Sequence, residues 1–213
     1  MAKVSFINDI KAEPKLLPLY LSHKRSEIVR KLFYMLISDK KFYNRLFKRH
    51  FGRAVDFNNP KTLNEKIQWL KLYERDDFHT ICADKYGVRN YIAKTFGAEY
   101  LIPLLFETTN YKDIVPENIP NCNCIIKTNH GNGGHVIVRE ANRASLNYPI
   151  IRENFRHMLK TNYYQATREW QYKNIKPRII IEKLLETKDG KIPNDYKLHY
   201  INGELQFIYV SYD

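Results

Sequence analysis

The sequence predicts an α+β fold in which a helical N-terminal segment precedes antiparallel strands around a glycine-rich hairpin. Up to about Gly97, apolar residues recur at intervals of three and four positions, the period of an amphipathic helix. After that point, short runs of Ile and Val alternate with turn residues, which is typical of antiparallel strands. Three of the eight glycines, Gly131, Gly133 and Gly134, fall between two such runs.

Residues 1–56 form the first expected region, a basic helical segment. Its apolar pattern runs from about Ser22 to His50 and includes Ile28 and Leu32, with Lys and Arg between them. Residues 1–60 contain 13 Lys and Arg against 5 Asp and Glu, so this part carries most of the net charge of +12. Such a segment attracts nucleic acid, anionic lipid or a polyanionic substrate, or it is simply a solvated basic face.

Residues 57–97 form the second expected region, which is also helical. Thr62 and Glu65 have the spacing of a capping box, and the apolar face that follows predicts a helix over Thr62–Glu74. A further helix is expected over roughly Thr80–Thr95.

Residues 98–213 form the third expected region, which contains the strands. We expect a strand over Cys124–Thr128, a glycine turn over Asn129–His135 and a returning strand over Val136–Arg139. A helical stretch at about Pro149–Tyr164 then precedes a strand in "RIIIEKLLE". The last two strands, in "DYKLHYINGELQFIYVSY", are joined by Asn-Gly, the dipeptide suited to a type I′ hairpin.

The composition indicates a folded protein of the cytoplasm. Of its 213 residues, 44% are hydrophobic and 14% aromatic, which is typical of a globular chain. With only three cysteines, the chain favours a reducing compartment over export. No apolar run approaches the roughly 20 residues needed to span a bilayer. We expect a cytoplasmic protein that can contact the inner face of the membrane through its basic segment. The basic residues follow no recognition motif, so we expect no nucleic acid as partner.

The glycine turn has the composition of an anion-binding loop. Glycine lacks a Cβ and tolerates positive φ, so backbone N–H groups of the turn can approach a ligand closely. Lys127 stands four residues before Gly131 and adds a positive charge. The backbone N–H groups and this lysine together would suit the phosphates of a nucleotide. Neither the P-loop spacing nor G-x-G-x-x-G before a helix is present. The alternative is an ordinary hairpin turn with an exposed lysine.

Two later segments extend the same hypothesis. Glu182 and Lys183 lie where an apolar strand gives way to a connecting segment, which can offer backbone groups and a lysine to an adenine edge. Lys197 shares one side of an alternating strand with Asp195 and His199, and it can reach a terminal phosphate. The alternatives are a strand-end ion pair at Glu182 and a solvent-facing side chain at Lys197.

In this order, the segments resemble the nucleotide site of the ATP-grasp superfamily. The longer string from about Phe57 to the last residue resembles the TupA-like ATP-grasp family, which is named for teichuronopeptide synthesis and occurs among surface-polysaccharide genes. The string consists of "NNPKTLNEKIQWLKLYERD", "DKYGVR", "YLIPLL", "KTNHGNGG", "REWQYKNIKPRIIIEKLLE" and "NDYKLHYINGE".

The resemblance implies an ATP-grasp-like fold and a role for each matching residue. ATP-grasp ligases hold ATP between two α+β subdomains, form an acyl phosphate on a carboxylate and let an amine attack it. Lys127 and Lys197 would bind phosphate, and Gly131–Gly134 would form a flexible lid. Glu182–Leu185 would form the adenine hinge, in which Lys183 would contact the base. His130 would either assist there or shape the turn. The expected nucleotide-binding set is Lys127, His130, Gly131, Gly133, Gly134, Glu182, Lys183, Leu185 and Lys197.

The magnesium site departs from the family pattern. ATP-grasp enzymes hold Mg²⁺ with acidic residues and an Asn on strands after this hairpin. Here the only acidic residues after Lys197 are Glu204 and Asp213. We therefore expect ATP and Mg²⁺ as cofactors with no metal ligands in this chain, an ATP-grasp-like fold truncated at the C-terminus, and no assignable catalytic residue.

Three functions follow from these observations. The first is an ATP-dependent carboxylate–amine ligase of capsular or surface-polysaccharide synthesis. It would act on a polysaccharide or lipid-linked glycan precursor with an amine or carboxylate co-substrate. The second is a glycosyltransferase of the same process, although the chain has no D-x-D motif for a sugar-nucleotide metal. The third is a non-catalytic truncated relative that binds nucleotide or membrane.

Overall fold

The computed structural model describes residues 6–212 and begins with three helices. These are α1 (Phe6–Ala12), α2 (Leu16–Leu36) and α3 (Asp39–Phe51). The pattern over Ser22–His50, predicted as continuous, therefore belongs to two helices. The chain leaves the helix at Ile37, whose φ is −124° and ψ 120°, and Ser38 then caps α3 by accepting a hydrogen bond from the Lys41 N–H.

Three further helices follow: α4 (Leu63–Tyr73), α5 (Asp77–Ala83) and α6 (Val88–Thr95). The capping box predicted at the start of α4 is confirmed. The helix predicted over Thr80–Thr95 is instead two short helices, because Asp84 is extended with φ −82° and ψ 103°. This break brings the backbone of Lys85 against the glycine turn, where its N–H donates to the Asn129 carbonyl at 3.1 Å.

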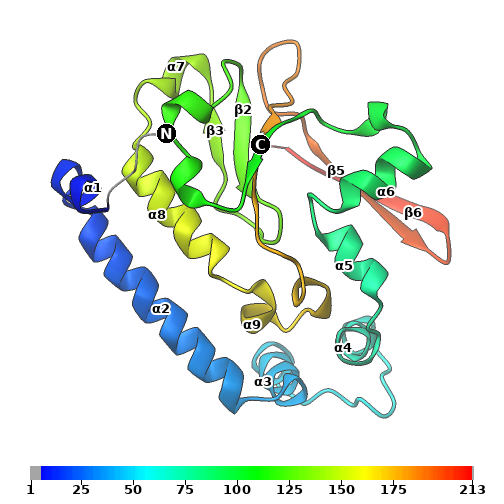
Figure 1. Ribbon diagram of the computed structural model, residues 1–213. Helices are drawn as coiled ribbons and strands as arrows, with labels where there is room; N and C mark the ends of the chain where they lie inside the picture. The colour runs from blue at the N-terminus through cyan, green and yellow to red at the C-terminus, as the bar shows by residue number, and fades with distance from the viewer. Residues whose placement is uncertain (1–5, 213) are drawn as a thin grey trace.

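Four antiparallel strands form the main sheet in the order β1-β4-β2-β3. They are β1 (Leu104–Thr108), β2 (Cys124–Thr128), β3 (Val136–Val138) and β4 (Ile179–Lys183) (Figure 1). The connections contain α7 (Glu140–Arg143), α8 (Tyr148–Leu159) and α9 (Tyr163–Thr167), with short 3₁₀ turns at Ala98–Tyr100, Tyr111–Asp113, Pro116–Asn118 and Trp170–Tyr172. The predicted α+β class is confirmed.

The main core lies between one face of this sheet and α8. Successive strand residues point to opposite faces, so Cys124 and Ile126 are fully buried in that core while Ile125 and Lys127 lie on the other face. The core is composed of Ile114, Ile119, Cys124, Ile126, Val138, Ile151, Phe155, Ile179 and Ile181. The opposite face of the sheet is therefore available for a site.

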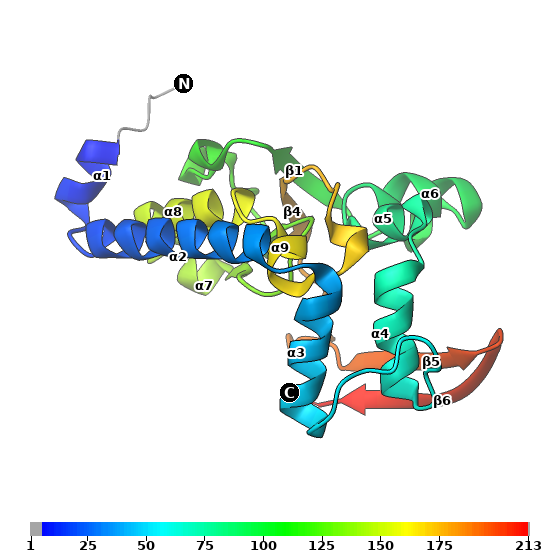
Figure 2. The same cartoon turned by 90° about the horizontal axis from the view of Figure 1, so that it is seen from below.

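The last two strands form a ribbon of their own, β5 (Asp195–Ile201) and β6 (Glu204–Ser211). Figure 2 shows this ribbon apart from β1 and β4. Asn202 and Gly203 have φ values of 52° and 82°, the positive values that the predicted type I′ turn requires at both central residues. Nearly all side chains of the ribbon are exposed.

The N-terminal helices lie against the rest of the molecule. In Figures 1 and 2, α2 runs alongside α8 and reaches α9, and it contacts both of these helices. A second small core of Tyr43, Phe47, Val55 and Phe57 joins α3 to the segment before α4. Within residues 6–212, no helix combines the length and apolar character needed to cross a bilayer.

Candidate functional site

A cleft of about 780 Å³ lies on the sheet face that does not pack against α8. Its floor is formed by residues of three strands: Ile125 and Lys127 of β2, Ile137 of β3 and Glu182 of β4. The last residue of β4, parts of the segment that follows it and the first residue of β5 form a wall. The wall residues are Lys183, Leu184, Leu185, Ile192, Pro193, Asn194 and Asp195. The floor of the cleft thus combines two isoleucines with the charged pair Lys127 and Glu182.

Glu182 organises the charged part of this cleft. Its side chain is buried, and its two oxygens face different cations. Lys127 Nζ lies 2.5 Å from Oε2, and Arg89 Nη1 lies 3.0 Å from Oε1. Arg89 also donates from Nη2 to the Ile102 carbonyl at 2.7 Å. The buried carboxylate therefore holds two cations from separate elements in fixed positions, because leaving it unpaired would be costly.

Lys85 adds a third cation next to this pair. Its Nζ donates to the Gly131 carbonyl at 2.5 Å, so it joins the break between α5 and α6 to the glycine turn. Burial and then the nearby charge of Lys127 lower the pKa of the Lys85 ammonium. Three cations around one buried carboxylate leave an excess of positive charge, which is the electrostatic condition for binding a phosphate.

The turn itself is held by Asn129. The Asn129 side chain donates to Asp84 Oδ1 at 2.8 Å and to the Lys176 carbonyl at 3.0 Å, and its Oδ1 accepts from the Arg178 N–H at 2.7 Å. Every hydrogen-bonding group of this buried amide thus has a partner outside its own strand. The start of the turn is consequently fixed to both the helical part and the segment that leads into β4.

Glycine is needed at two positions of the turn. Gly133 and Gly134 have φ values of 76° and 67°, in the left-handed region. A Cβ on Gly134 would lie 2.9 Å from Sδ and Cε of Met158, and one on Gly131 would lie 3.3 Å from Thr128 Oγ1. These three predicted glycines lie beyond the end of β2 and are not among the residues that line the cleft.

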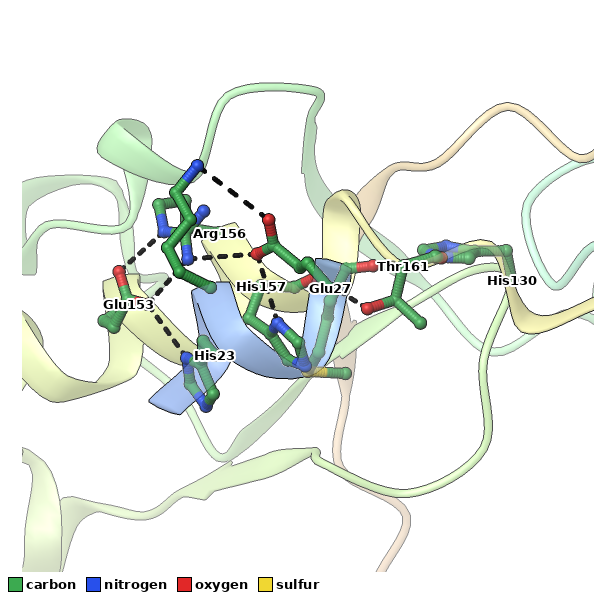
Figure 3. A network of polar contacts seen from close by, with 9 residues as sticks. His23, Glu27, His130, Glu153, Arg156, His157 and Thr161 are labelled. Atoms are coloured by element: carbon green, nitrogen blue, oxygen red, sulfur yellow. Dashed lines mark hydrogen bonds and ion pairs between the residues drawn. The ribbon is translucent and has the colours of Figure 1, made fainter. Parts of the chain in front are cut away.

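His130 anchors the turn to the end of α8. Its Nε2 lies 3.1 Å from the carbonyl oxygens of both Met158 and Thr161, and Figure 3 shows His130 beside Thr161. Its Nδ1 lies 3.2 Å from Asn129 Oδ1. Burial lowers the pKa of the imidazole. These contacts favour the turn-shaping role over contact with a ligand.

The segment after β4 offers backbone groups to the cleft. The N–H groups of Lys183 and Leu184 already donate to the carbonyls of Pro103 and Asn123, each at 3.0 Å. The N–H of Leu185 has no acceptor among the residues that the structure describes, and this residue lines the cleft with its side chain half-exposed. The predicted hinge therefore presents one amide for a ligand.

Lys197 lies apart from the other predicted residues. It is on β5, its Nζ is 2.7 Å from Asp195 Oδ2, and its side chain is exposed. Asp195 lines the cleft but Lys197 does not. Of the predicted set, the structure thus brings Lys127, Glu182, Lys183 and Leu185 to one cleft and places Lys197 outside it.

Two cations of the site, Lys85 and Arg89, were not in the predicted set. Both belong to "DKYGVR", which was part of the family resemblance but has no spacing that assigns a role. Only the fold brings them to Gly131 and Glu182. Among residues 6–212, no group of three or more His, Cys, Asp or Glu side chains is placed to hold a metal ion.

Comparison with known proteins gives one finding. A family model described as TupA-like ATPgrasp matches residues 65–213, well over half of the chain. No curated protein and no solved structure gives a significant match. The matched segment contains the whole main sheet, the cleft and the three cations described above.

Proposed function

The chain belongs to the TupA-like ATP-grasp family, and on that premise we propose that it binds ATP in the cleft and activates a carboxylate for attack by an amine. The observation that carries the proposal is the meeting of cations around buried Glu182. Lys127 and Glu182 line the largely apolar cleft, Arg89 pairs with Glu182, and Lys85 is close enough to Lys127 for the charge of Lys127 to lower its pKa. This arrangement separates an apolar place for a base from a cationic place for phosphates.

The strand register supports one direction for the proposed nucleotide. Cys124 pairs with Lys183 at one end of β2, and Lys127 pairs with Ile180 towards the other end. The hinge and the phosphate-binding lysine are therefore separated by three residues along β2, about 10 Å. The base would lie by Leu185, accepting a hydrogen bond from its N–H. The phosphates would lie by Lys127 and the glycine turn.

The proposed reaction has two steps, each of which forms one bond and breaks another. A carboxylate oxygen of the substrate attacks the γ-phosphorus of ATP, and the bond from that phosphorus to the bridging oxygen breaks, so that ADP leaves. The nitrogen of the amine then attacks the carbonyl of the acyl phosphate, inorganic phosphate leaves, and the amine loses a proton. The cations of the cleft would stabilise the negative charge on the transferred group.

Magnesium does not fit the residues described. The carboxylates nearest to the cleft are already engaged: Glu182 with Lys127 and Arg89, and Asp195 with Lys197. Family membership implies Mg²⁺ together with ATP, but these side chains offer no open set of oxygen ligands, so no step is assigned to the metal. The proposed co-substrates are a carboxylate and an amine, one of them on a surface-polysaccharide or lipid-linked glycan precursor, as the family resemblance suggests.

Calorimetric titration of the full chain with ATP tests the proposal. We expect Lys127→Met to weaken ATP binding by roughly ten- to a hundredfold, because one charge-assisted contact to phosphate is lost. Lys112→Met is the matched control, since Lys112 is exposed on a 3₁₀ turn outside the cleft. Equal affinity of the wild-type protein and Lys127→Met would contradict the proposal. A titration with a nucleotide sugar separates the ligase from the glycosyltransferase alternative.

A further inference from the structure

Helix α2 turns an apolar stripe towards solvent. Leu17, Leu21, Ile28, Leu32 and Met35 are between 43% and 75% exposed. With 100° between successive residues, these five side chains lie within about 60° of one another around the helix axis. An amphipathic helix normally buries such a stripe against the core. The stripe, which we call the α2 outer stripe, has no partner among the residues that the structure describes.

The face of α2 that contacts α8 is mainly polar, although Leu16 at the start of the helix is buried. His23 Nδ1 lies 2.8 Å from Glu153 Oε1, and Glu27 Oε1 accepts from Arg156 Nη2 at 3.2 Å (Figure 3). The rings of His23 and His157 stack with centroids 4.1 Å apart. The helix is thus attached to α8 through ion pairs and stacked rings, while the five aliphatic side chains of the α2 outer stripe are exposed.

The acidic side chains of the N-terminal helices lie on the same inner face as the polar contacts of α2. The segment Phe6–Phe51 contains four acidic residues, and all four point towards the rest of the protein. Asp9 pairs with Arg152, Glu13 accepts from Asn147, Glu27 pairs with Arg156, and Asp39 pairs with Arg75 and Arg168. The surface that remains outside is therefore both apolar and basic.

Cations border the α2 outer stripe on both sides. Lys24 and Lys31 lie along one edge and Arg25 along the other, as the helical positions require. A hollow of about 490 Å³ at the corner between α2 and α3 has the same chemistry. Its lining residues are Phe33, Phe42, Leu46, Arg45 and Arg49, so guanidinium groups stand beside apolar side chains.

We propose that the α2 outer stripe docks on an anionic lipid surface, with α2 lying in the plane of the interface. The apolar side chains would enter the boundary between head groups and acyl chains, and Lys24, Arg25 and Lys31 would contact the lipid phosphates. The paired acids on the inner face leave no negative charge to oppose this contact. The proposal does not depend on ATP binding, since the stripe lies outside the residues matched to the family.

Flotation of the full chain with vesicles tests the proposal. We expect binding to vesicles that contain phosphatidylglycerol and little binding to phosphatidylcholine alone. The triple variant Leu21→Gln, Ile28→Gln, Leu32→Gln should weaken the partition coefficient by at least about tenfold. The double variant Arg25→Gln, Lys31→Gln should weaken it by about fivefold for each cation removed, and added salt should have the same effect.

A matched control uses exposed apolar residues on another helix. Leu63→Gln, Ile67→Gln, Leu70→Gln on α4 removes the same kind of side chain and should leave vesicle binding unchanged. Circular dichroism and thermal unfolding verify that each variant is folded. Absence of wild-type binding to anionic vesicles at low salt, or equal binding by the stripe variant, would overturn the proposal. A dimer that the stripe variant dissociates, without vesicle binding, would assign the stripe to a second copy of the chain instead.

Discussion

Glu182 shows how one residue can link several parts of the site. It is buried on β4 and pairs with Lys127 of β2 and with Arg89 of α6. Its carboxylate fixes two cations before any ligand arrives, and such preorganisation reduces the entropy lost when a phosphate is bound. The site is therefore assembled by a residue whose own charge has the same sign as that of the phosphate: Glu182 acts through the two cations that it holds.

His130 gives a prediction at the same scale. Its pKa in the folded protein lies below the ordinary value of about 6.5, because burial penalises the imidazolium. The unfolded chain then binds more protons between the two pKa values. The stability that this residue contributes is complete above the unfolded pKa and is lost as the pH falls towards the folded one.

Urea unfolding of the full chain between about pH 8 and about pH 5 measures this effect. We expect the free energy of unfolding to fall with pH in the wild-type protein and to fall less steeply in His130→Gln, which cannot be protonated. His157 is partly buried and also has a lowered pKa, so some slope should persist in the variant. Parallel curves for the two proteins would contradict the prediction.

Single residues also show what sequence alone could predict. Lys127 could be placed beside a glycine turn because the two are adjacent in the chain. Its partner Glu182 lies 55 positions further along the chain, and only the pairing of β2 with β4 brings the two together. The expectation that Lys197 shares the phosphate site remains a prediction. The strand period gives its side but not the distance of the β5–β6 ribbon from the main sheet.

At the scale of elements, local signals fixed the start of α4. Thr62 Oγ1 accepts from the Glu65 N–H and donates to Glu65 Oε2 at 2.9 Å. We expect Thr62→Ala to lower the free energy of unfolding by about 1 kcal/mol and Thr62→Ser to retain most of it. Chemical denaturation measures both. Thr95→Ala, at the other end of the helical part, is the control and should change stability far less.

Two other helix boundaries were not predicted because the apolar period continues across them. Ser38 caps α3 in the middle of the pattern over Ser22–His50, and Asp84 interrupts the pattern over Thr80–Thr95. In the second case, the break is stabilised by distant residues. Asn129 donates to the Asp84 side chain and accepts from the Lys85 N–H, so tertiary contacts outweigh helix propensity.

At the scale of the whole molecule, periodicity predicts elements but not their neighbours. The strands β1 and β4 pair across a long stretch of sequence, and no local pattern gives that order. The same holds for α2. The spacing of Ile28 and Leu32 predicted a helix correctly, yet these residues are exposed, and polar residues hold the helix in place. Which face of a helix is covered depends on the surface that it meets.

The central claim is that the face of the sheet opposite α8 binds a nucleotide along β2. Hydrogen exchange measured by mass spectrometry, with and without ATP, tests this claim most directly. We predict slower exchange in two segments, 127–135 and 183–186, and unchanged exchange across α2. No change in these two segments at saturating ATP, or protection confined to another part of the chain, would contradict the account.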